Sequence, residues 1–339
     1  MTTEPIGGSM TKMFRTAAVV LGLAVVLAAC GSSSSSSSTT KSTTTSTPAA
    51  TPTGPVVGTP PAATSGPGVG KPPVTLGDKN FTEEFILGAL YTQALAAKGY
   101  KVTLKANIGS SELIYKALQS GQIEGYPEYT GTLLTAIANN TAPPKSAQDA
   151  YQEAKAFLQT HGYTMLNDTP FFDSDAIGTT KAYATAHHLT TIADLKALGK
   201  SVKLGGLPEF ETRAQGLVGL KKVYGINPTF VPLASGLFYN ALSSGQVNVS
   251  DVFTTDPQLG SGKYVVLTDP QHEFGFQNAA LIIKQSVLNA EGPAFAQTVN
   301  KVSSLLTTKA IIAMNAAVAL DKQPPPAVAH AFLAANGLL

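Results

Sequence analysis

Short apolar runs alternate with longer segments in which apolar residues recur every three or four positions, beginning at residue 74. Val74–Gly77 and Val102–Leu104 have the pattern of strands, and the segment from Asn80 to about Lys98 has the apolar spacing of a helix. Asn80 and Glu83, three residues apart, resemble a capping arrangement at the start of this helix. The pattern predicts an α/β body that starts near residue 74.

The same alternation continues toward the carboxyl end. We expect helices at Ala147–Gly162, Ala193–Leu198 and Ala214–Val223, and strands at Val202–Leu204 and Thr229–Val231. Strands that alternate with helices favour parallel sheets covered by helices. The tail, 293–339, is alanine-rich and helical in pattern, interrupted by three consecutive prolines. Because we expect no strand in this tail, it should pack on one of the existing lobes.

One segment occurs twice in altered form. Tyr115–Thr130, YKALQSGQIEGYPEYT, returns as Tyr239–Thr254, YNALSSGQVNVSDVFT. Each copy reads as a helix closed by a glycine (Gly121 or Gly245), then a strand and an aromatic–Thr pair. Pro127 cannot donate a ladder hydrogen bond, so we expect the first strand to end near it. Since residues at the carboxyl ends of such strands line ligand crevices, the repeat indicates two lobes that share a cleft; the alternative is an ending common to unrelated α/β units.

The amino terminus predicts an exported lipoprotein. Lys12 and Arg15 precede the apolar run Thr16–Ala29, which is shorter than the roughly 20 residues of a membrane span but suits a signal peptide over 1–29. The charged residues begin late, so an internal methionine could be the initiator. Small residues before Cys30 resemble the lipoprotein cleavage pattern, in which this cysteine becomes the lipidated first residue. A small buried hydrophobe is the other interpretation of a single cysteine.

Residues 30–73 comprise the lipidated Cys30 and a predicted disordered linker. The segment contains the serine run Ser32–Ser38 and many Thr and Pro residues, with too little apolar surface to offset the entropy of ordering. Its composition would also suit O-glycosylation. A lipid at one end and a folded body at the other predict a protein held at the outer face of the cytoplasmic membrane.

Composition excludes several classes of protein. The 23 basic and 21 acidic residues nearly balance, which argues against a nucleic-acid or polybasic membrane surface. Cys30 is the single cysteine, so the folded part has no disulfide and no cysteine-based metal site. We expect no cofactor and no metal; the adjacent His187 and His188 suit an exposed surface, with metal binding as the other interpretation.

Enzyme motifs such as H-E-x-x-H, G-x-S-x-G and a P-loop do not occur, so we expect no enzymatic activity. Carboxylates near the expected cleft could act as an acid/base pair, but their spacing is not specific to that chemistry. They are Glu128, Asp173, Asp175, Asp251 and Asp256.

Arg213 is the only arginine after residue 15. Its guanidinium could bind the acidic group of a ligand with two parallel hydrogen bonds, or it could form an ion pair with Glu209, Glu211 or an aspartate. Lys79 is a weaker candidate for binding a ligand. The helix start at residues 109–111 could bind an anion or simply carry an N-cap.

From Val74 to the carboxyl end, the chain resembles the substrate-binding proteins of osmoprotectant ABC importers, which take up glycine betaine, choline, carnitine or proline. The resemblance implies a two-lobed periplasmic-binding-protein fold (type II), each lobe a sheet flanked by helices with the ligand cleft between them. It implies lobe 1 at 74–175 and 277–339, and lobe 2 at 176–276. It rests on Gly77–Glu83 (GDKNFTE), Ala117–Gly121 (ALQSG), Tyr126–Thr132 (YPEYTGT), Pro208–Arg213 (PEFETR), Tyr239–Asp256 and Asn278–Ala280 (NAA).

In this family a cage of tyrosines holds the quaternary ammonium by cation–π contact, and basic and hydroxyl groups hold the carboxylate. By resemblance, Tyr129 matches one cage tyrosine. Thr132, Lys79 and Arg213 match positions on the carboxylate side.

Four candidate ligand-binding positions depart from the family pattern. Ile177 stands where an aromatic is expected, and Phe253 and Gln277 each replace a tyrosine. Asp175 stands where relatives tend to have an amide. These differences suit a ligand with more hydroxyl or amine donors.

The sequence therefore predicts a monomeric, lipid-anchored solute-binding protein that captures glycine betaine or a related polar or zwitterionic osmoprotectant and delivers it to an ABC permease by lobe closure. One alternative is a protein of the same fold for a polyol, polyphenol or amino-acid derivative. Another is a surface adhesin or sensor lipoprotein. A hydrolase or lyase that uses the cleft carboxylates is a third.

Overall fold

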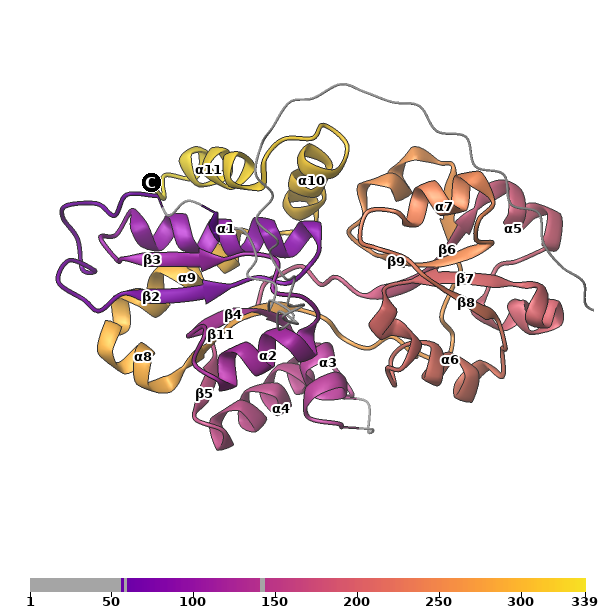
Figure 1. The fold of residues 1–339 in the computed structure, drawn as a ribbon, viewed down its shortest axis with the longest axis horizontal. Helices are drawn as coiled ribbons and strands as arrows, with labels where there is room; N and C mark the ends of the chain where they lie inside the picture. The colour runs from indigo at the N-terminus through magenta and orange to yellow at the C-terminus, as the bar shows by residue number, and fades with distance from the viewer. Residues whose placement is uncertain (1–55, 58–59, 141–143) are drawn as a thin grey trace, which may run out of the picture. The chain divides into compact units, whose positions relative to one another are not determined.

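Two β-sheets, each covered by helices, make up the part of the chain that the computed structural model describes, residues 56–57, 60–140 and 144–339 (Figure 1). The predicted signal peptide and Cys30 lie outside the described residues.

We call the first sheet with its helices lobe 1 and the second lobe 2. The first sheet has the strand order β1 (Val56–Val57), β3 (Val102–Lys105), β2 (Val74–Gly77), β4 (Gly125–Tyr129), β11 (Ala279–Lys284) and β5 (Tyr163–Met165). The second has the order β10 (Tyr264–Val266), β6 (Asp175–Thr180), β9 (Val249–Phe253), β7 (Lys203–Gly206) and β8 (Thr229–Pro232).

The helices belong to the lobe whose strands precede or follow them in the chain. Lobe 1 contains α1 (Thr82–Ala96), α2 (Ser111–Gln119), α3 (Thr130–Thr132), α4 (Ala147–Thr160), α8 (Gln285–Glu291), α9 (Pro293–Leu305), α10 (Thr308–Ala319) and α11 (Pro325–Ala335). Lobe 2 contains α5 (Lys181–His187), α6 (Leu217–Tyr224) and α7 (Phe238–Ser244). Tighter 3₁₀ segments occur at Ile192–Ser201, Pro208–Glu211 and Pro257–Ser261, and Leu133–Ile137 forms a π-helical turn. The helix expected at Ala193–Leu198 is therefore a 3₁₀ segment.

Both sheets are mixed, which corrects the expectation of parallel sheets. The strands β3, β2 and β4 run parallel, whereas β11 runs antiparallel to both β4 and β5. In lobe 2, β7 is parallel to β8 and β9, and β6 is antiparallel to β9 and β10. The prediction found the helix-linked strands and missed the antiparallel ones, because these are not joined to their neighbours by a regular strand–helix alternation.

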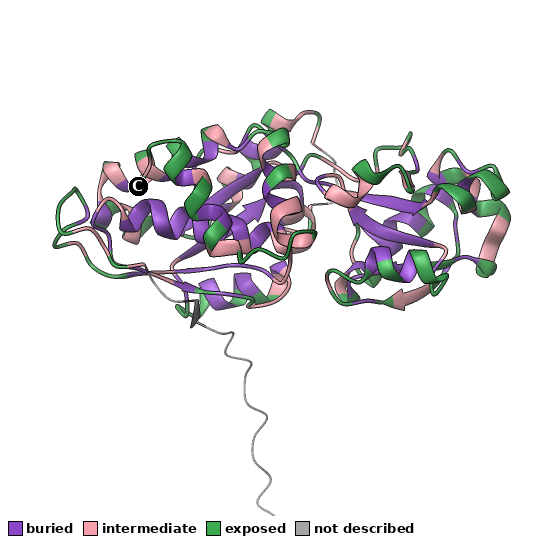
Figure 2. Ribbon diagram, turned by 90° about the horizontal axis from the view of Figure 1, so that it is seen from above, coloured by how far each residue is buried: buried purple, intermediate pink, exposed green. Residues whose placement is uncertain are grey.

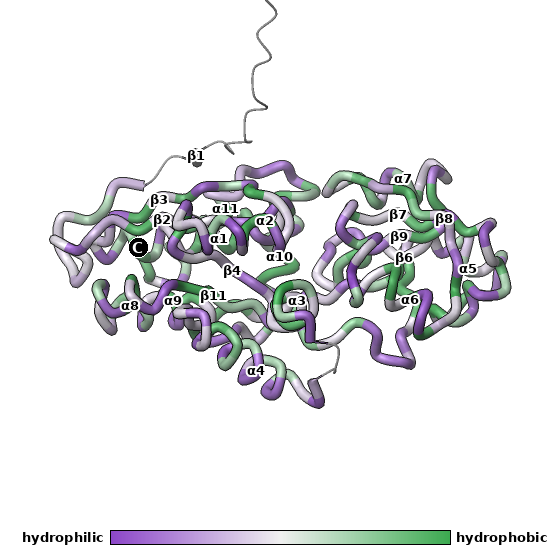
Figure 3. Tube along the Cα trace, turned by 60° about the horizontal axis from the view of Figure 1, so that its bottom comes forward, coloured by the Kyte–Doolittle hydropathy of each residue, from purple (hydrophilic) through white to green (hydrophobic). Residues whose placement is uncertain are grey.

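Each sheet is buried on both faces, and β11 shows this directly. Leu281 and Ile283 belong to the core shared with α1 and the tail helices, whereas Ala280 and Ile282 belong to the core shared with α2 and α4. Successive side chains of a strand point to opposite faces, so an unbroken apolar run fits a strand covered on both sides. The buried strands and inner helix faces form the interior in Figure 2, and β11 is apolar along nearly its whole length (Figure 3).

The repeated segment forms the same unit in each lobe, as predicted. The first copy is α2 followed by β4, and the second is α7 followed by β9. Gly121 and Gly245 close the helices with φ of 77° and 74°, a left-handed conformation that favours glycine.

Pro127 lies in the middle of β4 and does not end it, contrary to expectation. It pairs with Leu281 of β11. The N–H of Thr130, three residues on, donates to the Asn278 carbonyl, so alternation along the strand turns the nitrogen of Pro127 away from β11. The proline therefore removes no hydrogen bond from the β4–β11 ladder.

Part of the segment expected to be a disordered linker is ordered. In 60–73, the N–H of Ala63 donates to the Ala96 carbonyl and the N–H of Gly68 to the Lys98 carbonyl, each at 2.9 Å. These bonds satisfy carbonyls near the carboxyl end of α1, where a helix leaves its last acceptors without partners. Composition could not show this, because the hydrogen-bonding groups belong to the backbone.

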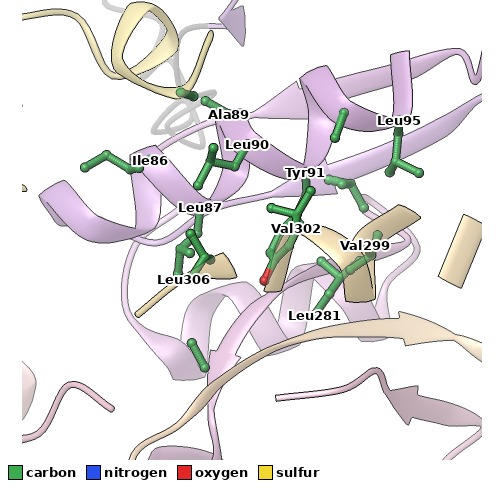
Figure 4. Packing of buried hydrophobic residues seen from close by; sticks show 14 of the residues in the cluster. Ile86, Leu87, Ala89, Leu90, Tyr91, Leu95, Leu281, Val299, Val302 and Leu306 are labelled. Atoms are coloured by element: carbon green, nitrogen blue, oxygen red, sulfur yellow. The ribbon is translucent and has the colours of Figure 1, made fainter. Parts of the chain in front are cut away.

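The carboxyl-terminal helices pack on lobe 1, as predicted. Val299, Val302 and Leu306 contact the apolar face of α1 near Tyr91 (Figure 4). Among the described residues, no single helix is long and apolar enough to cross a membrane; α9 and α10 reach that length and composition only as a pair bent by 87°.

The chain passes between the lobes twice, through neighbouring segments. The first crossing follows β5 and the second follows β10. The two crossings lie side by side, because Phe172 and Asn278 form an isolated antiparallel bridge and the N–H of Asp173 donates to the Gln277 carbonyl at 3.0 Å.

Candidate ligand-binding site

A pocket lies between residues of the two lobes at the ends of β2, β4, β6 and β9. Its floor and walls combine aromatic rings, carboxylates and two basic side chains. The lining residues are Lys79, Asn80, Phe81, Ser110, Ser111, Tyr129, Thr132 and Asp173, followed by Asp175, Leu207, Glu209, Phe210, Arg213, Asp251 and Phe253. Six of the eight predicted site residues line this pocket: Lys79, Tyr129, Thr132, Asp175, Arg213 and Phe253.

Three aromatic rings stand in a row in the pocket. Phe81 stacks on Tyr129 with ring centroids 6.0 Å apart and on Phe253 with centroids 5.4 Å apart. Phe81 and Tyr129 come from lobe 1 and Phe253 from lobe 2. The row brings aromatic faces of both lobes together, the type of surface that attracts an organic cation.

Lys79 is bound within the protein. Its ammonium donates to Glu128 Oε1 at 2.5 Å and lies 3.7 Å from Glu84 Oε1. The same ammonium lies 4.4 Å from the centroid of the Tyr129 ring. The lysine and both carboxylates are buried, so its charge is balanced by the protein before any ligand arrives.

Arg213 forms an ion pair across the pocket with Glu112 of α2. Its Nε donates to Glu112 Oε1 and its Nη2 to Glu112 Oε2, each at 3.0 Å. Burial alone would raise the pKa of Glu112, but the hydrogen bonds and charge of Arg213 outweigh it and lower the pKa to about 2. The sequence expected Glu209, Glu211 or an aspartate as the intramolecular partner; the partner is instead a glutamate of the other lobe.

Asp175 and Asp251 form an acidic pair on neighbouring strands of lobe 2. Their side chains share a hydrogen bond, and Asp251 is 1% exposed. Burial raises the pKa of Asp251 well above its usual range, and the charge of Asp175 raises it further. Oδ1 of Asp251 has no hydrogen-bond partner among the described residues.

Glu83 anchors a second polar network beside the pocket. Its carboxylate accepts from the hydroxyls of Tyr129 and Thr255, each at 2.7 Å, and from the Asn315 amide at 2.9 Å. Thr255 follows β9 of lobe 2, so this network also joins the lobes. The expected capping arrangement is wrong: the N-cap of α1 is Phe81 rather than Asn80, its side chain has no group that can cap the helix, and the Glu83 carboxylate is held in this network.

Gln277 and Ile177 are absent from the pocket lining. The buried Gln277 amide oxygen accepts from the N–H of Thr132 at 2.9 Å and from its hydroxyl at 3.2 Å, so this residue positions Thr132. Ile177 is fully buried in the core of lobe 2. It lies two residues beyond Asp175 on the same face of β6, where core residues cover it.

A family model described as the substrate-binding domain of ABC-type glycine betaine transport systems matches residues 72–335. The chain belongs to this family. A glycine-betaine-binding protein of Pseudomonas aeruginosa is 31% identical over 276 residues, covering 78% of this chain and 88% of that protein. The glycine betaine-binding protein YehZ of Escherichia coli is 29% identical over 277 residues, covering 78% of this chain and 90% of that protein.

The fold agrees with the family. A solved structure of a glycine betaine/carnitine/choline ABC transporter has a TM-score of 0.62 and 26% sequence identity to this chain, covering 78% of it and 99% of that chain. The resemblance and the two-lobed type II fold predicted from the sequence are confirmed. The chain is thus an extracytoplasmic solute-binding transport protein, a family that works with a small ligand and a membrane permease.

Some residues that line the pocket were not predicted from the sequence to contact a ligand. Phe81 lies inside the motif that carries the resemblance, but the family pattern marks tyrosines and so does not predict this central ring. Asp173 and Asp251 also line the pocket, although the sequence indicates only a possible acid/base role for them. Their position at the ends of β-runs near the expected crossing was a usable signal. Among the described residues, no group of three or more His, Cys, Asp or Glu side chains is placed to hold a metal ion.

Proposed function

We propose that this protein captures a small quaternary-ammonium solute, glycine betaine or a close relative, and delivers it to the permease of an ABC importer. The observation that carries the proposal is the row formed by Phe81, Tyr129 and Phe253 in a pocket that also contains carboxylates. Aromatic faces and negative charge both stabilise an organic cation. The names of the relatives that bind glycine betaine support the same class of solute.

Capture requires the lobes to close on the ligand. Arg213 with Glu112 and Thr255 with Glu83 are bonds between lobes, so they exist only when the lobes are together. A ligand that contacts Phe81 in lobe 1 and Phe253 in lobe 2 stabilises the closed arrangement of the lobes. Its binding therefore shifts the population toward that arrangement. The paired crossings beside Phe172 and Asn278 act as the hinge.

The proposal includes the expected organisation of the chain. A signal peptide, residues 1–29, directs export, Cys30 carries the lipid, and the monomeric body is held at the outer face of the cytoplasmic membrane. Lobe 1 comprises 74–175 and 277–339, and lobe 2 comprises 176–276. The ordered stretch 60–73 adds to lobe 1 and leaves a shorter linker than composition alone suggested.

Isothermal titration calorimetry tests the ligand. The chain from Gly31 onward keeps every residue that the structure describes, and we expect it to bind at least one of glycine betaine, choline and carnitine. Ligand-dependent compaction in X-ray scattering should accompany binding. No heat with any of the three, or heat with proline alone, would refute the proposal.

The anchor is tested separately. Cys30→Ala should abolish incorporation of radiolabelled palmitate into the protein in expressing cells. The matched variant Ser32→Ala, in the same segment, should still be labelled. Equal labelling of both variants would contradict lipidation at Cys30.

A further inference from the structure

A second cavity adjoins the ligand pocket, and both are lined by Phe81, Asp173 and Phe253. Beyond these shared residues, the cavity is formed by the start of α1 and by α10 in lobe 1, and by α7 and the segment after β9 in lobe 2. Its volume is about 50 Å³. Since one water needs about 10–15 Å³ of such space, the cavity has room for a group of about three or four non-hydrogen atoms.

Two neutral acceptors in the walls of this cavity lack a donor. Oδ1 of Asn315 and Oε1 of Gln258 are buried without a hydrogen-bond partner among the described residues. Asn315 is only 4% exposed, and the orientation of its amide is fixed because the nitrogen donates to Glu83 at 2.9 Å and to the Thr255 carbonyl at 3.3 Å. A buried acceptor without a donor is costly, so a donor from a bound molecule would relieve that cost.

The charged groups of the cavity are all acidic. Glu83, Asp173 and Asp256 line it, and none of the described residues that line it is basic. Lys79 and Arg213 line the first pocket instead, where each is bound to a glutamate. Burial raises the pKa of Glu83 and of Asp173, and the charges of neighbouring carboxyls raise both further. The cavity therefore favours a donor that also carries a positive charge.

We propose that this cavity is a second binding site, which takes the ammonium group of a small primary amine. The N–H groups of the amine donate to Asn315 Oδ1, to Gln258 Oε1 and to the Asp256 carboxylate. Its carbon atoms contact the rings of Phe238 and Phe253, which complete the walls. This goes beyond the proposed function, because a quaternary ammonium has no N–H to donate and because the site does not depend on the first pocket.

Ethylammonium, which has three non-hydrogen atoms, is the probe. Saturation-transfer NMR uses the purified full-length chain in detergent at about pH 8, where Asp256, with a pKa of about 6, is ionised. Ethylammonium should bind, and excess glycine betaine or tetramethylammonium should not displace it. Ethanol has the same shape without the charge and should bind at least tenfold more weakly, because hydrogen bonds between charged groups are the stronger ones.

Two variants test the site itself, since Asp256 and Gln258 line the second cavity and not the first pocket. Asp256→Asn removes the charge but keeps an acceptor for the Tyr239 hydroxyl, and it should weaken ethylammonium about tenfold. Gln258→Met removes a neutral acceptor and should weaken ethylammonium about threefold. Asp321→Asn, an exposed carboxylate just after α10, is the matched control and should leave the dissociation constant unchanged.

The possible failures are distinct. Absence of ethylammonium binding, displacement by glycine betaine or tetramethylammonium, or equal binding of ethanol would overturn the inference and leave the proposed function standing. Unchanged binding in folded Asp256→Asn and Gln258→Met would also overturn it. Circular dichroism and the melting temperature report folding, and Gln258→Met decides alone if Asp256→Asn does not fold. Failure of glycine betaine to bind the wild type would count against the proposed function only, because the two variants still decide the second site.

Discussion

Arg213 of lobe 2 and Glu112 of lobe 1 face each other with two hydrogen bonds of 3.0 Å. The two side chains are 18% and 35% exposed, so the ion pair lies at the rim of the pocket. An arginine that the family resemblance assigns to the carboxylate of the ligand is therefore also placed to hold the lobes together.

Glu112→Gln should weaken binding of every ligand by a similar factor, about threefold to tenfold, because it weakens the bond that closes the lobes and is partly screened by solvent. Dissociation constants of choline and glycine betaine by calorimetry measure this. Glu211→Gln, which removes an exposed carboxylate near Arg213, is the control and should have little effect. If Glu112→Gln instead strengthened glycine betaine alone, Arg213 would be a carboxylate site released by the change.

Phe81→Leu should weaken a trimethylammonium ligand about tenfold or more, because it keeps apolar bulk but removes the central ring, and a desolvated cation–π contact contributes about 2 kcal/mol. Calorimetry with choline and with its neutral carbon analogue 3,3-dimethylbutanol measures the effect. The neutral analogue should lose much less. Phe157→Leu in α4, away from the pocket lining, should leave both affinities unchanged, and equal losses for the two ligands in Phe81→Leu would argue against cation–π recognition.

Ile177→Val should lower the free energy of unfolding by about 0.5–1.5 kcal/mol and leave ligand affinity unchanged, because the side chain is buried in the core of lobe 2. Denaturant unfolding and calorimetry measure the two quantities. Phe253→Leu, on the neighbouring strand but in the pocket lining, should show the opposite pattern of weaker binding. A loss of affinity in a stably folded Ile177→Val would restore this residue to the ligand site.

Affinity for a cation should rise with pH between about 5 and 8. Burial raises the pKa of Asp256, behind Phe253, to about 6, and burial and neighbouring carboxyls raise that of Asp173 well above its usual range. A bound cation favours the ionised carboxylates, so binding releases protons and strengthens as pH rises, by up to about tenfold per pH unit for each proton released. Calorimetry in buffers of different ionisation enthalpy counts the protons.

Asp256→Asn should flatten this pH dependence near pH 6. Asp149→Asn, an exposed carboxylate on α4, should leave it unchanged. Proton uptake on binding would contradict the sign of the coupling.

The local parts of the fold were predictable from the sequence. The helix–glycine–strand unit found twice gave α2 with β4 and α7 with β9, because helical spacing and a left-handed glycine are properties of a few adjacent residues. The antiparallel strands β6 and β10 were not found. Their order in the sheet is set by long-range pairing, which leaves little local trace.

The candidate site was predictable as a set of positions but not as a set of contacts. Tyr129, Asp175 and Phe253 line one pocket, since strand ends meet there, and their role toward a ligand stays a prediction. The partner of Arg213 could not be found, because Glu112 lies in the other lobe and is distant in sequence. Ile177 entered the candidate site by family resemblance alone, which gives an equivalent position but not the local packing that buries this side chain in the core of lobe 2.

The neighbouring crossings at Phe172 and Asn278 have a consequence for how such proteins diversify. The chain enters and leaves lobe 2 through adjacent segments, so the whole of lobe 2 is one exchangeable module. Replacing it with the corresponding module of a relative would change Arg213, Asp251 and Phe253 together while Phe81 and Tyr129 stay in place. Recombination at these two crossings can therefore produce a new ligand preference without rebuilding the first sheet.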